Sequence, residues 1–187
     1  MEMQEKEVAI ISDIARARQL GLMPLFEKAS AQFGVPKQIL MAVASRESRM
    51  GDALGSNPED AFRGDNNNGH GIMQIDIRFH KEFVSNHPPN DHEAIINKSA
   101  EILGNQFASF QNWKYALAAY NTGPSDVNKA IKEDKDPDIF TTGGNYGKDV
   151  LRRAKIIEKQ VDPAESRFGV IIILLLIGFG LNRFTTL

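Results

Sequence analysis

A glutamate on the apolar side of a predicted helix is the first residue here whose type and position could do chemistry. One face of the helix predicted for residues 36–50 carries, at positions i, i+3, i+4 and i+7, Leu40, Val43, Ala44 and Glu47. Desolvation penalises the ionised form of a carboxyl among apolar groups, so such a carboxyl tends to keep its proton. A protonated carboxyl near neutral pH can act as a general acid. The helix alone leaves one alternative open, an ion pair of Glu47 with Arg46, Arg49 or an arginine elsewhere.

Two aspartates lie in the polar segment that follows. Asp65 and Asp76 flank glycines at positions 69 and 71, where the backbone can approach a ligand or another strand closely. Hydrolysis of a glycosidic bond with inversion needs an acid and a base on opposite sides of the sugar, with room for a water between them. A glutamate on the helix and an aspartate in this segment would meet that need. Taken alone, Asp65 is more typical of a turn, because Asp-Asn near glycine is ordinary turn chemistry.

The elements that must position these residues are mostly helical. The apolar pattern predicts helices over 6–20, 24–33, 36–50, 91–110, 112–121, 124–133 and 145–160. Between Met50 and Phe79 the composition changes to Gly, Asn, Asp and Ser, which predicts turns and a short hairpin around residues 71–75. We therefore expect an all-α domain with at most a small β-hairpin. Long polar excursions of this kind in compact domains are more often functional than decorative.

Composition limits the possible functions. A length of 187 residues suits one domain, and a net charge of −2 makes nucleic acid a poor candidate partner. The absence of cysteine excludes disulfides, thiolate metal sites and a cysteine nucleophile. The four histidines do not form a zinc pattern, and no histidine is placed to activate Ser45 or Ser48. We expect neither a metal nor an organic cofactor.

Four sequence blocks carry a family resemblance. They are Ser45-Arg-Glu-Ser48, the segment from Asp65 to Gly71-Ile-Met-Gln-Ile-Asp76, Ala119-Tyr-Asn-Thr-Gly123, and Tyr146-x2-Asp149-Val. In this order they resemble goose-type lysozymes of glycoside hydrolase family 23, over roughly residues 20 to 160. One block would be weak support, whereas four in order are specific.

The resemblance implies a lysozyme-like fold and cleavage of the β-1,4 bond between N-acetylmuramic acid and N-acetylglucosamine in peptidoglycan. It implies that Glu47 is the general acid and that Asp65 and Asp76 position or activate the attacking water, without saying which is the base. The positions it assigns to the sugar groove are Tyr120, Asn121 and Tyr146, with a floor formed by Gly71, Ile72, Met73 and Gln74.

Two other functions stay open. Lytic transglycosylases keep the glutamate and the Ala-Tyr-Asn block but generally lack the aspartate pair, and they give an anhydro product. The presence of Asp65 and Asp76 favours hydrolysis. A membrane-anchored cell-wall-binding protein without activity is the second alternative. The chain departs from the secreted vertebrate members in lacking disulfides, in its Asn66-Asn67-Asn68 turn, and in having His70 where an apolar residue is expected.

The C-terminal segment predicts a membrane anchor. Residues 168–181 carry no charge, and counting on to 187 with a snorkelling Arg183 brings the segment close to the length of a bilayer span. A buried C-terminal helix is the alternative. The expected organisation is an extension (1–20), a catalytic domain (21–160), a linker (161–167) and the anchor (168–187). The N-terminus does not resemble a secretory signal. We expect a monomeric, membrane-anchored protein that acts on the bacterial cell wall, such as a bacteriophage lysis or entry protein or a tail-anchored bacterial enzyme.

Overall fold

The computed structural model describes residues 2–54, 62–64 and 66–161, and every structural statement below refers to these residues. In chain order the elements are α1 (Glu2–Gln19), α2 (Met23–Phe33), α3 (Lys37–Ser48), β1 (Arg63–Gly64), β2 (Gly69–His70), β3 (Ile75–Asp76), α4 (Lys81–Asn86), α5 (His92–Phe110), α6 (Trp113–Thr122), α7 (Pro124–Lys132), the 3-10 turns η1 (Pro137–Phe140) and η2 (Thr142–Gly144), and α8 (Tyr146–Val161). The expected fold class, mostly helical with a small antiparallel sheet, is confirmed.

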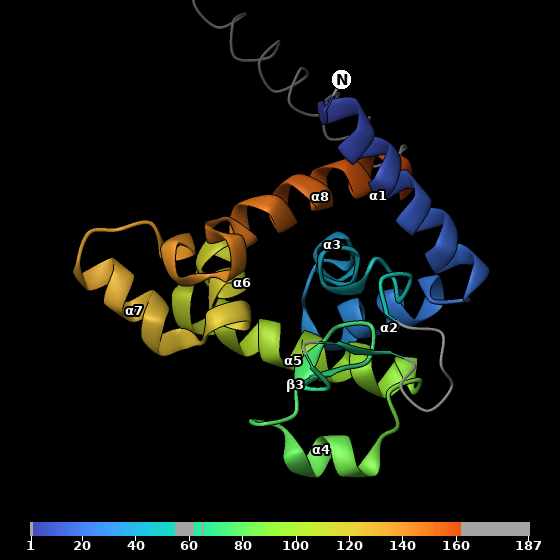
Figure 1. Cartoon of the computed structure of the whole chain (residues 1–187), viewed down its shortest axis with the longest axis horizontal. Coiled ribbons are helices and arrows are strands. Elements are labelled where there is room, and N and C mark those ends of the chain that lie inside the picture. The colour runs from blue at the N-terminus through green and yellow to red at the C-terminus, as the bar shows by residue number, and fades with distance from the viewer. Residues whose placement is uncertain (1, 55–61, 65, 162–187) are drawn as a thin grey trace, which may run out of the picture.

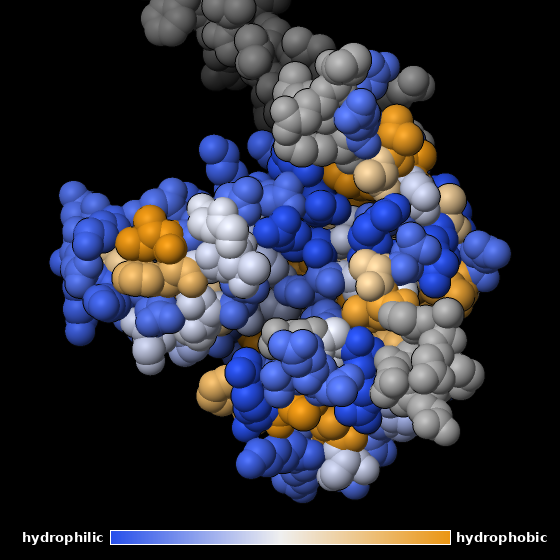
Figure 2. Space-filling model, viewed as in Figure 1, coloured by the Kyte–Doolittle hydropathy of each residue, from blue (hydrophilic) through white to orange (hydrophobic). Residues whose placement is uncertain are grey.

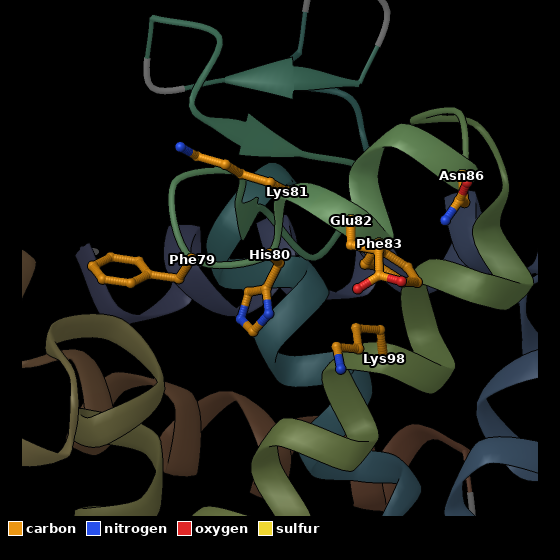
Figure 3. Close-up of a pocket in the computed structure, with 7 residues that line it drawn as sticks. All are labelled: Phe79, His80, Lys81, Glu82, Phe83, Asn86 and Lys98. Atoms are coloured by element: carbon orange, nitrogen blue, oxygen red, sulfur yellow. The ribbon is translucent and has the colours of Figure 1, made fainter.

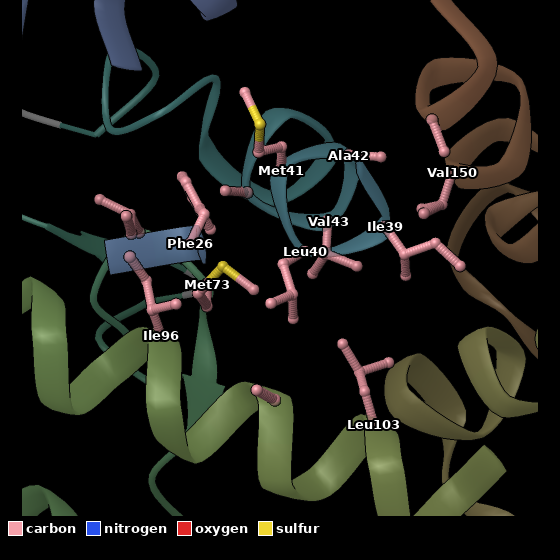
Figure 4. Packing of buried hydrophobic residues seen from close by; sticks show 14 of the residues in the cluster. Phe26, Ile39, Leu40, Met41, Ala42, Val43, Met73, Ile96, Leu103 and Val150 are labelled. Carbon is pink, nitrogen blue, oxygen red and sulfur yellow. The ribbon is translucent and has the colours of Figure 1, made fainter. Parts of the chain in front are cut away.

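Helix α3 is the centre of the fold. It packs against α8 on one side and against α2 and α5 on others, and Figure 1 shows it nearly end-on beneath α8. Its residues from Ile39 to Ser45 are all buried, because a helix that is apolar on most of its circumference needs neighbours around it. In Figure 4, Ile39 points toward Val150 of α8, whereas Leu40 lies between Met73 and Leu103 of α5. Glu47 therefore stands on the most enclosed helix of the molecule.

Two lobes flank this centre. Helix α7 packs on α6 and η1 and forms one of them, and the sheet with α4 forms the other (Figure 1). Figure 2 shows that the surface recedes between the two lobes. Helix α3 lies near the centre of the view in Figure 1, with the sheet below it.

The sheet has the strand order β1-β2-β3, with antiparallel pairs Arg63↔His70 and His70↔Ile75. The predicted hairpin around residues 71–75 corresponds to β2–β3. Strand β1 was not predicted, because a two-residue strand carries no readable period. The side chain of Gln74 lies over the backbone of Gly64 and Gly69, where an added Cβ would meet its Oε1 at 2.2 and 2.0 Å. These two glycines therefore allow the strands to pass under Gln74.

A buried polar network fixes α3 relative to α1 and α8. Asp13 of α1 is 2% exposed and accepts a hydrogen bond from the Ser45 hydroxyl at 2.6 Å. Arg153 of α8 donates to the same hydroxyl at 2.8 Å and to Asp149 at 2.8 Å. Burial raises the pKa of Asp13, and the Ser45 hydrogen bond and two arginine charges oppose that rise. Buried charges are tolerated only when they are paired in this way.

The structure describes the N-terminal helix but not the proposed C-terminal anchor. Helix α1 contributes Ile10, Ile14 and Ala17 to the same core as the rest of the domain. The proposed linker beyond Val161 and the proposed anchor (168–187) lie outside the described residues. Among the helices that are described, none is both long and apolar enough to cross a bilayer.

Gly71 should be sensitive to substitution. It has a φ of +70°, and an added Cβ would meet Ile95 atoms at 2.8 Å in the core. Gly21 has a φ of +68° with no atom within 4 Å, so it is a matched control for backbone strain alone. We expect Gly71→Ala to lower the free energy of unfolding by about 1–3 kcal/mol more than Gly21→Ala does, because of overpacking. Urea unfolding of both variants measures this, and equal losses would contradict the close contact.

Candidate active site

The carboxyl of Glu47 is held by a tyrosine from the opposite half of the chain. Glu47 lies in the last turn of α3 and is partly buried, and its Oε1 accepts a hydrogen bond from the hydroxyl of Tyr146, the first residue of α8. Tyr146 is itself buried, at 1% exposure. Because 98 residues separate the two along the chain, the packing of α3 on α8 creates this contact. Glu47 and Tyr146, both expected at the site, are thus brought together.

Burial raises the pKa of Glu47 to about 7. The hydrogen bond from Tyr146 and the positive charge of Arg46 act in the opposite direction but are outweighed. The position of the residue adds to the effect of burial, since the last turn of a helix presents the negative end of its dipole to a carboxylate. A substantial fraction of this carboxyl is therefore protonated near neutral pH, in agreement with the expectation from the helical pattern.

The two arginines that helical spacing offered as partners for Glu47 are bound elsewhere. Arg46 lies 3.5 Å from Asp149 and donates to the Thr142 carbonyl at 3.3 Å. Its guanidinium also lies 5.8 Å from the centre of the Tyr146 ring, within range of a cation–π contact. Arg49 turns toward Asp13 and Asp52, at 3.5 and 3.6 Å. The ion-pair alternative is thereby replaced by a hydrogen bond to an uncharged phenol.

Tyr120 joins the site from α6. Its hydroxyl donates to the Met73 carbonyl at 2.8 Å and lies 3.1 Å from the Ser99 hydroxyl. Burial and the nearby charge of Glu47 raise its pKa. Burial, together with the charges of Glu47 and Tyr120, raises the pKa of Tyr146. The Tyr120 phenol ties α6 to the turn after β2 and to α5.

Of the four residues expected at the floor of a sugar groove, Gly71, Ile72 and Met73 are buried and Gln74 is partly buried. The side chains of Ile72 and Met73 are fully buried in the core, while their carbonyls accept hydrogen bonds from Ser48 and Tyr120. Gly71 is buried as well, and its carbonyl accepts a hydrogen bond from the Gln74 amide at 2.7 Å. The turn is therefore fastened through its backbone to the ends of α3 and α6.

Asn121 is engaged in positioning a neighbouring loop. Its Oδ1 accepts a hydrogen bond from the Thr142 backbone N–H at 2.8 Å. The Thr142 carbonyl in turn accepts from Arg46. Through these bonds α6 and α3 both hold η2, which leads directly into Tyr146.

Asp76 is partly exposed and ionised. The guanidinium of Arg78 binds both of its oxygens, with Nε at 2.9 and 3.0 Å, and the Arg78 backbone N–H donates at 2.8 Å. These hydrogen bonds hold the pKa of Asp76 below its ordinary value. Asp65, the other expected carboxylate, lies outside the described residues.

Sequence reasoning missed the parts played by Arg46 and Asp149. Asp149 lies 3.5 Å from Arg46 and accepts hydrogen bonds from Arg152 and Arg153 at 2.8 Å each. These two hydrogen bonds outweigh the effect of burial and lower the pKa of Asp149. The available signal was its place one helical turn after Tyr146, inside a block already noted for the family. In the described part of the chain no three His, Asp or Glu side chains gather as a metal site.

The raised pKa of Glu47 makes a prediction about stability. Between pH 4.5 and about 7 the folded chain keeps a proton that the unfolded chain releases, so stability falls as pH rises through this window. Glutamine has no such proton and can still accept the Tyr146 hydrogen bond. We expect Glu47→Gln to be more stable than the unaltered chain above pH 7, by about 3 kcal/mol at most, and to lose this advantage below pH 4.5. Urea unfolding across pH measures it, with exposed Glu7→Gln as the control, and an advantage independent of pH would contradict it.

Comparisons with known proteins agree with this geometry. The sequence model of the family described as LysG, Lysozyme g, matches residues 12–161. Lysozyme g of Struthio camelus is 31% identical over 137 residues, covering 70% of this chain and 63% of the relative, so the chain spans slightly less than two thirds of that protein. The lysozymes g of Casuarius casuarius and Epinephelus coioides are 31% and 32% identical, with 69% and 71% of their lengths covered and 70% of this chain in each case. All four motif blocks fall within the matched residues, and the chain belongs to the lysozyme g family.

Proposed function

We propose that this protein is a peptidoglycan N-acetylmuramidase that hydrolyses the β-1,4 bond between N-acetylmuramic acid and N-acetylglucosamine. The observation that carries the proposal is the partly buried Glu47 carboxyl, with a pKa of about 7 and a hydrogen bond from Tyr146. A general acid works best when its pKa is close to the pH at which it acts. Membership of the lysozyme g family supplies the substrate class.

Glu47 is the proposed proton donor to the leaving glycosidic oxygen. As the bond breaks, positive charge builds on the sugar ring in an oxocarbenium-like transition state, and the carboxyl becomes a carboxylate. The Tyr146 hydroxyl and the Arg46 guanidinium then stabilise that carboxylate, since both favour the ionised form. The Tyr146 hydroxyl also holds the carboxyl in one orientation before the proton moves.

Asp76 and Asp65 are the proposed partners of the attacking water. In an inverting hydrolysis the water approaches from the face opposite the acid. Asp76 is held ionised by Arg78, and its lowered pKa makes it a weak base. Asp76 is therefore suited to orienting the water, and we propose that Asp65 shares the removal of its proton. No metal or organic cofactor enters this scheme.

The proposed sugar groove runs past the end of α3, between the two lobes (Figure 2). Residues 71–74, Tyr120, Asn121 and Tyr146 would form its walls. The hydrogen bonds of Tyr120 and Asn121 fix the turn after β2 and the η2 loop on its two sides. Peptidoglycan glycan strands are the proposed partner, bound by a single copy of the chain.

We also propose that residues 168–187 anchor the protein to a membrane, which would place the enzyme at the bacterial envelope. The support is the uncharged run from residue 168 to 181. Carbonate extraction of membranes from cells that express the full chain tests this proposal. Release of the chain into the soluble fraction would count against it.

Replacement of the acid tests the enzymatic proposal. Glu47→Gln keeps the size of the side chain but cannot donate the proton, and we expect reducing-sugar release from purified peptidoglycan to fall by about 10²–10⁴-fold. Glu7→Gln, an exposed change on α1, should keep full activity. Equal, negligible release by the unaltered chain and Glu47→Gln would refute the enzymatic proposal and leave the non-catalytic cell-wall-binding alternative.

The products distinguish hydrolysis from the transglycosylase reaction. We expect mass spectrometry to find muropeptides with a hydrated reducing end, because a water is the proposed nucleophile. Proton NMR of the first product formed should show the α-anomer, as inversion of a β-bond requires. Products lighter by one water would replace the hydrolase with a lytic transglycosylase.

A further inference from the structure

The position of Tyr146 depends on how helix α8 begins. Tyr146 is the first residue of α8, it is buried, and its hydroxyl donates to Glu47. The first backbone N–H groups of a helix have no partner within that helix, so buried ones must be satisfied from outside. The residues that satisfy them at this end of α8 also fix the point from which the Tyr146 side chain extends.

The turn η1 satisfies two of these N–H groups through one buried aspartate. Asp138 is 3% exposed, and its Oδ1 accepts a hydrogen bond from the Gly147 N–H at 2.7 Å, while its Oδ2 accepts one from the Lys148 N–H at 3.0 Å. A carboxylate at a helix N-terminus is stabilised by such charge-assisted hydrogen bonds and by the positive end of the helix dipole. Both oxygens of Asp138 are thus engaged with the first turn of α8.

Thr141 extends the connection to Tyr146 itself. The Thr141 hydroxyl donates to the Asp138 carbonyl at 2.7 Å and accepts a hydrogen bond from the Tyr146 N–H at 3.2 Å. The backbone N–H groups of Tyr146, Gly147 and Lys148 are therefore all bound by the η1 turn and its C-cap. Asp138 is common to the three bonds, since its side chain accepts two of them and its carbonyl orients the hydroxyl that accepts the third.

Asp138 is also fixed to α6. Its backbone N–H donates to Oδ1 of Asp136 at 3.0 Å, and the Lys114 ammonium of α6 binds Oδ2 of Asp136 at 2.6 Å. A Cβ added to Gly147 would meet the Lys114 carbonyl at 2.6 Å and Oδ1 of Asp138 at 3.2 Å. The glycine therefore lets the first turn of α8 approach both α6 and η1, which keeps the Asp138 hydrogen bonds short.

We infer that Asp138 is a positioning residue for the reaction, which holds the first turn of α8 where the Tyr146 hydroxyl reaches Glu47. The inference rests on the proposed function, in which Glu47 is the acid. Asp138 acts on Glu47 only through Tyr146 and takes no part in the proton transfer. Its removal should therefore change the acid in the same way as loss of the Tyr146 hydroxyl.

The direction of the change in the pKa of Glu47 separates lost position from lost charge. The Tyr146 hydrogen bond lowers this pKa, so displacement of the hydroxyl should raise it above about 7. Removal of a neighbouring negative charge would lower it, because the carboxylate would then form more easily. Asp138→Asn keeps the size of the side chain, but its NH₂ group replaces one acceptor oxygen and repels the backbone N–H that it faces.

NMR titration of the Glu47 carboxyl measures this pKa without depending on catalysis. We expect Asp138→Asn and Tyr146→Phe each to raise the pKa of Glu47, and the double variant to match Tyr146→Phe alone. On peptidoglycan we expect Asp138→Asn to lower kcat by about 10–100-fold with KM unchanged, because a misplaced group costs transition-state stabilisation and not ground-state binding.

Two control variants remove acidic side chains from the N-terminal ends of other helices. Asp91→Asn alters the N-cap of α5, where Oδ1 of Asp91 accepts a hydrogen bond from the Ala94 N–H at 3.1 Å. Glu82→Gln alters the first turn of α4, where Glu82 lines a hollow together with Lys98 (Figure 3). We expect both controls to leave the pKa of Glu47 unchanged, because neither residue contacts the start of α8.

An unchanged or lowered pKa of Glu47 in Asp138→Asn would overturn the inference, and so would an equal rise in Asp91→Asn or a further rise in the double variant. If Asp138→Asn does not fold, Thr141→Val replaces it in the same test, since it removes only the hydroxyl that binds the Tyr146 N–H. Activity separates the two proposals. The expected pKa changes in a chain that never cleaves peptidoglycan would refute the muramidase alone, whereas an active chain without them would refute the role of Asp138 alone.

Discussion

The structure depends on keeping one carboxyl uncharged at the end of a buried helix. Helix α3 is enclosed along most of its length, and Glu47 lies partly buried in its last turn. Desolvation and the negative end of the helix dipole both favour the protonated form. The Tyr146 hydrogen bond and the Arg46 charge oppose them, so the pKa stops near 7 instead of rising further. A fully apolar pocket would hold the proton too tightly for a donor, and an exposed position would lose it.

This balance is produced by the packing of α8 on α3. Helix α8 supplies Tyr146 to the carboxyl and Asp149 to Arg46, which keeps the arginine beside the phenol ring and prevents a direct ion pair with Glu47. One turn further along, Arg153 reaches Ser45 and the region of Asp13. Buried ion pairs add little net stability, but a broken one is expensive. The network therefore serves mainly to fix the register of α1, α3 and α8, on which the position of Tyr146 depends.

Much of the fold could be predicted from the sequence, because the apolar period of a regular helix can be recognised in its own segment of sequence. The predicted ranges 91–110, 112–121 and 145–160 agree with α5, α6 and α8 within one or two residues. Helix α4 has six residues and no buried one, so it gave no apolar period. Pro36 was predicted to be the first residue of its helix but is the N-cap of α3, which begins at Lys37. His70 is fully buried, and its Nε2 bonds to the His87 carbonyl at 2.8 Å, a contact that no local pattern shows. Glu47 and its neighbour Arg46 could be picked out on their own helix, whereas the contact with Tyr146 required the resemblance or the structure.

The pKa values of Glu47 and Asp76 are shifted in opposite directions, one by tertiary packing and the other by a local turn. Asp76 is ionised by Arg78, two residues away, together with backbone groups of its own turn. The burial that raises the pKa of Glu47 to about 7 exists only when α3 has packed against its neighbouring helices. Acid and base roles in one site need pKa values that are pushed apart. Here a local turn fixes the charge of Asp76, the proposed partner of the water, and the tertiary fold raises the pKa of Glu47, the proposed acid. Loosening of the helical core would therefore remove the acid first and leave the aspartate's charge in place.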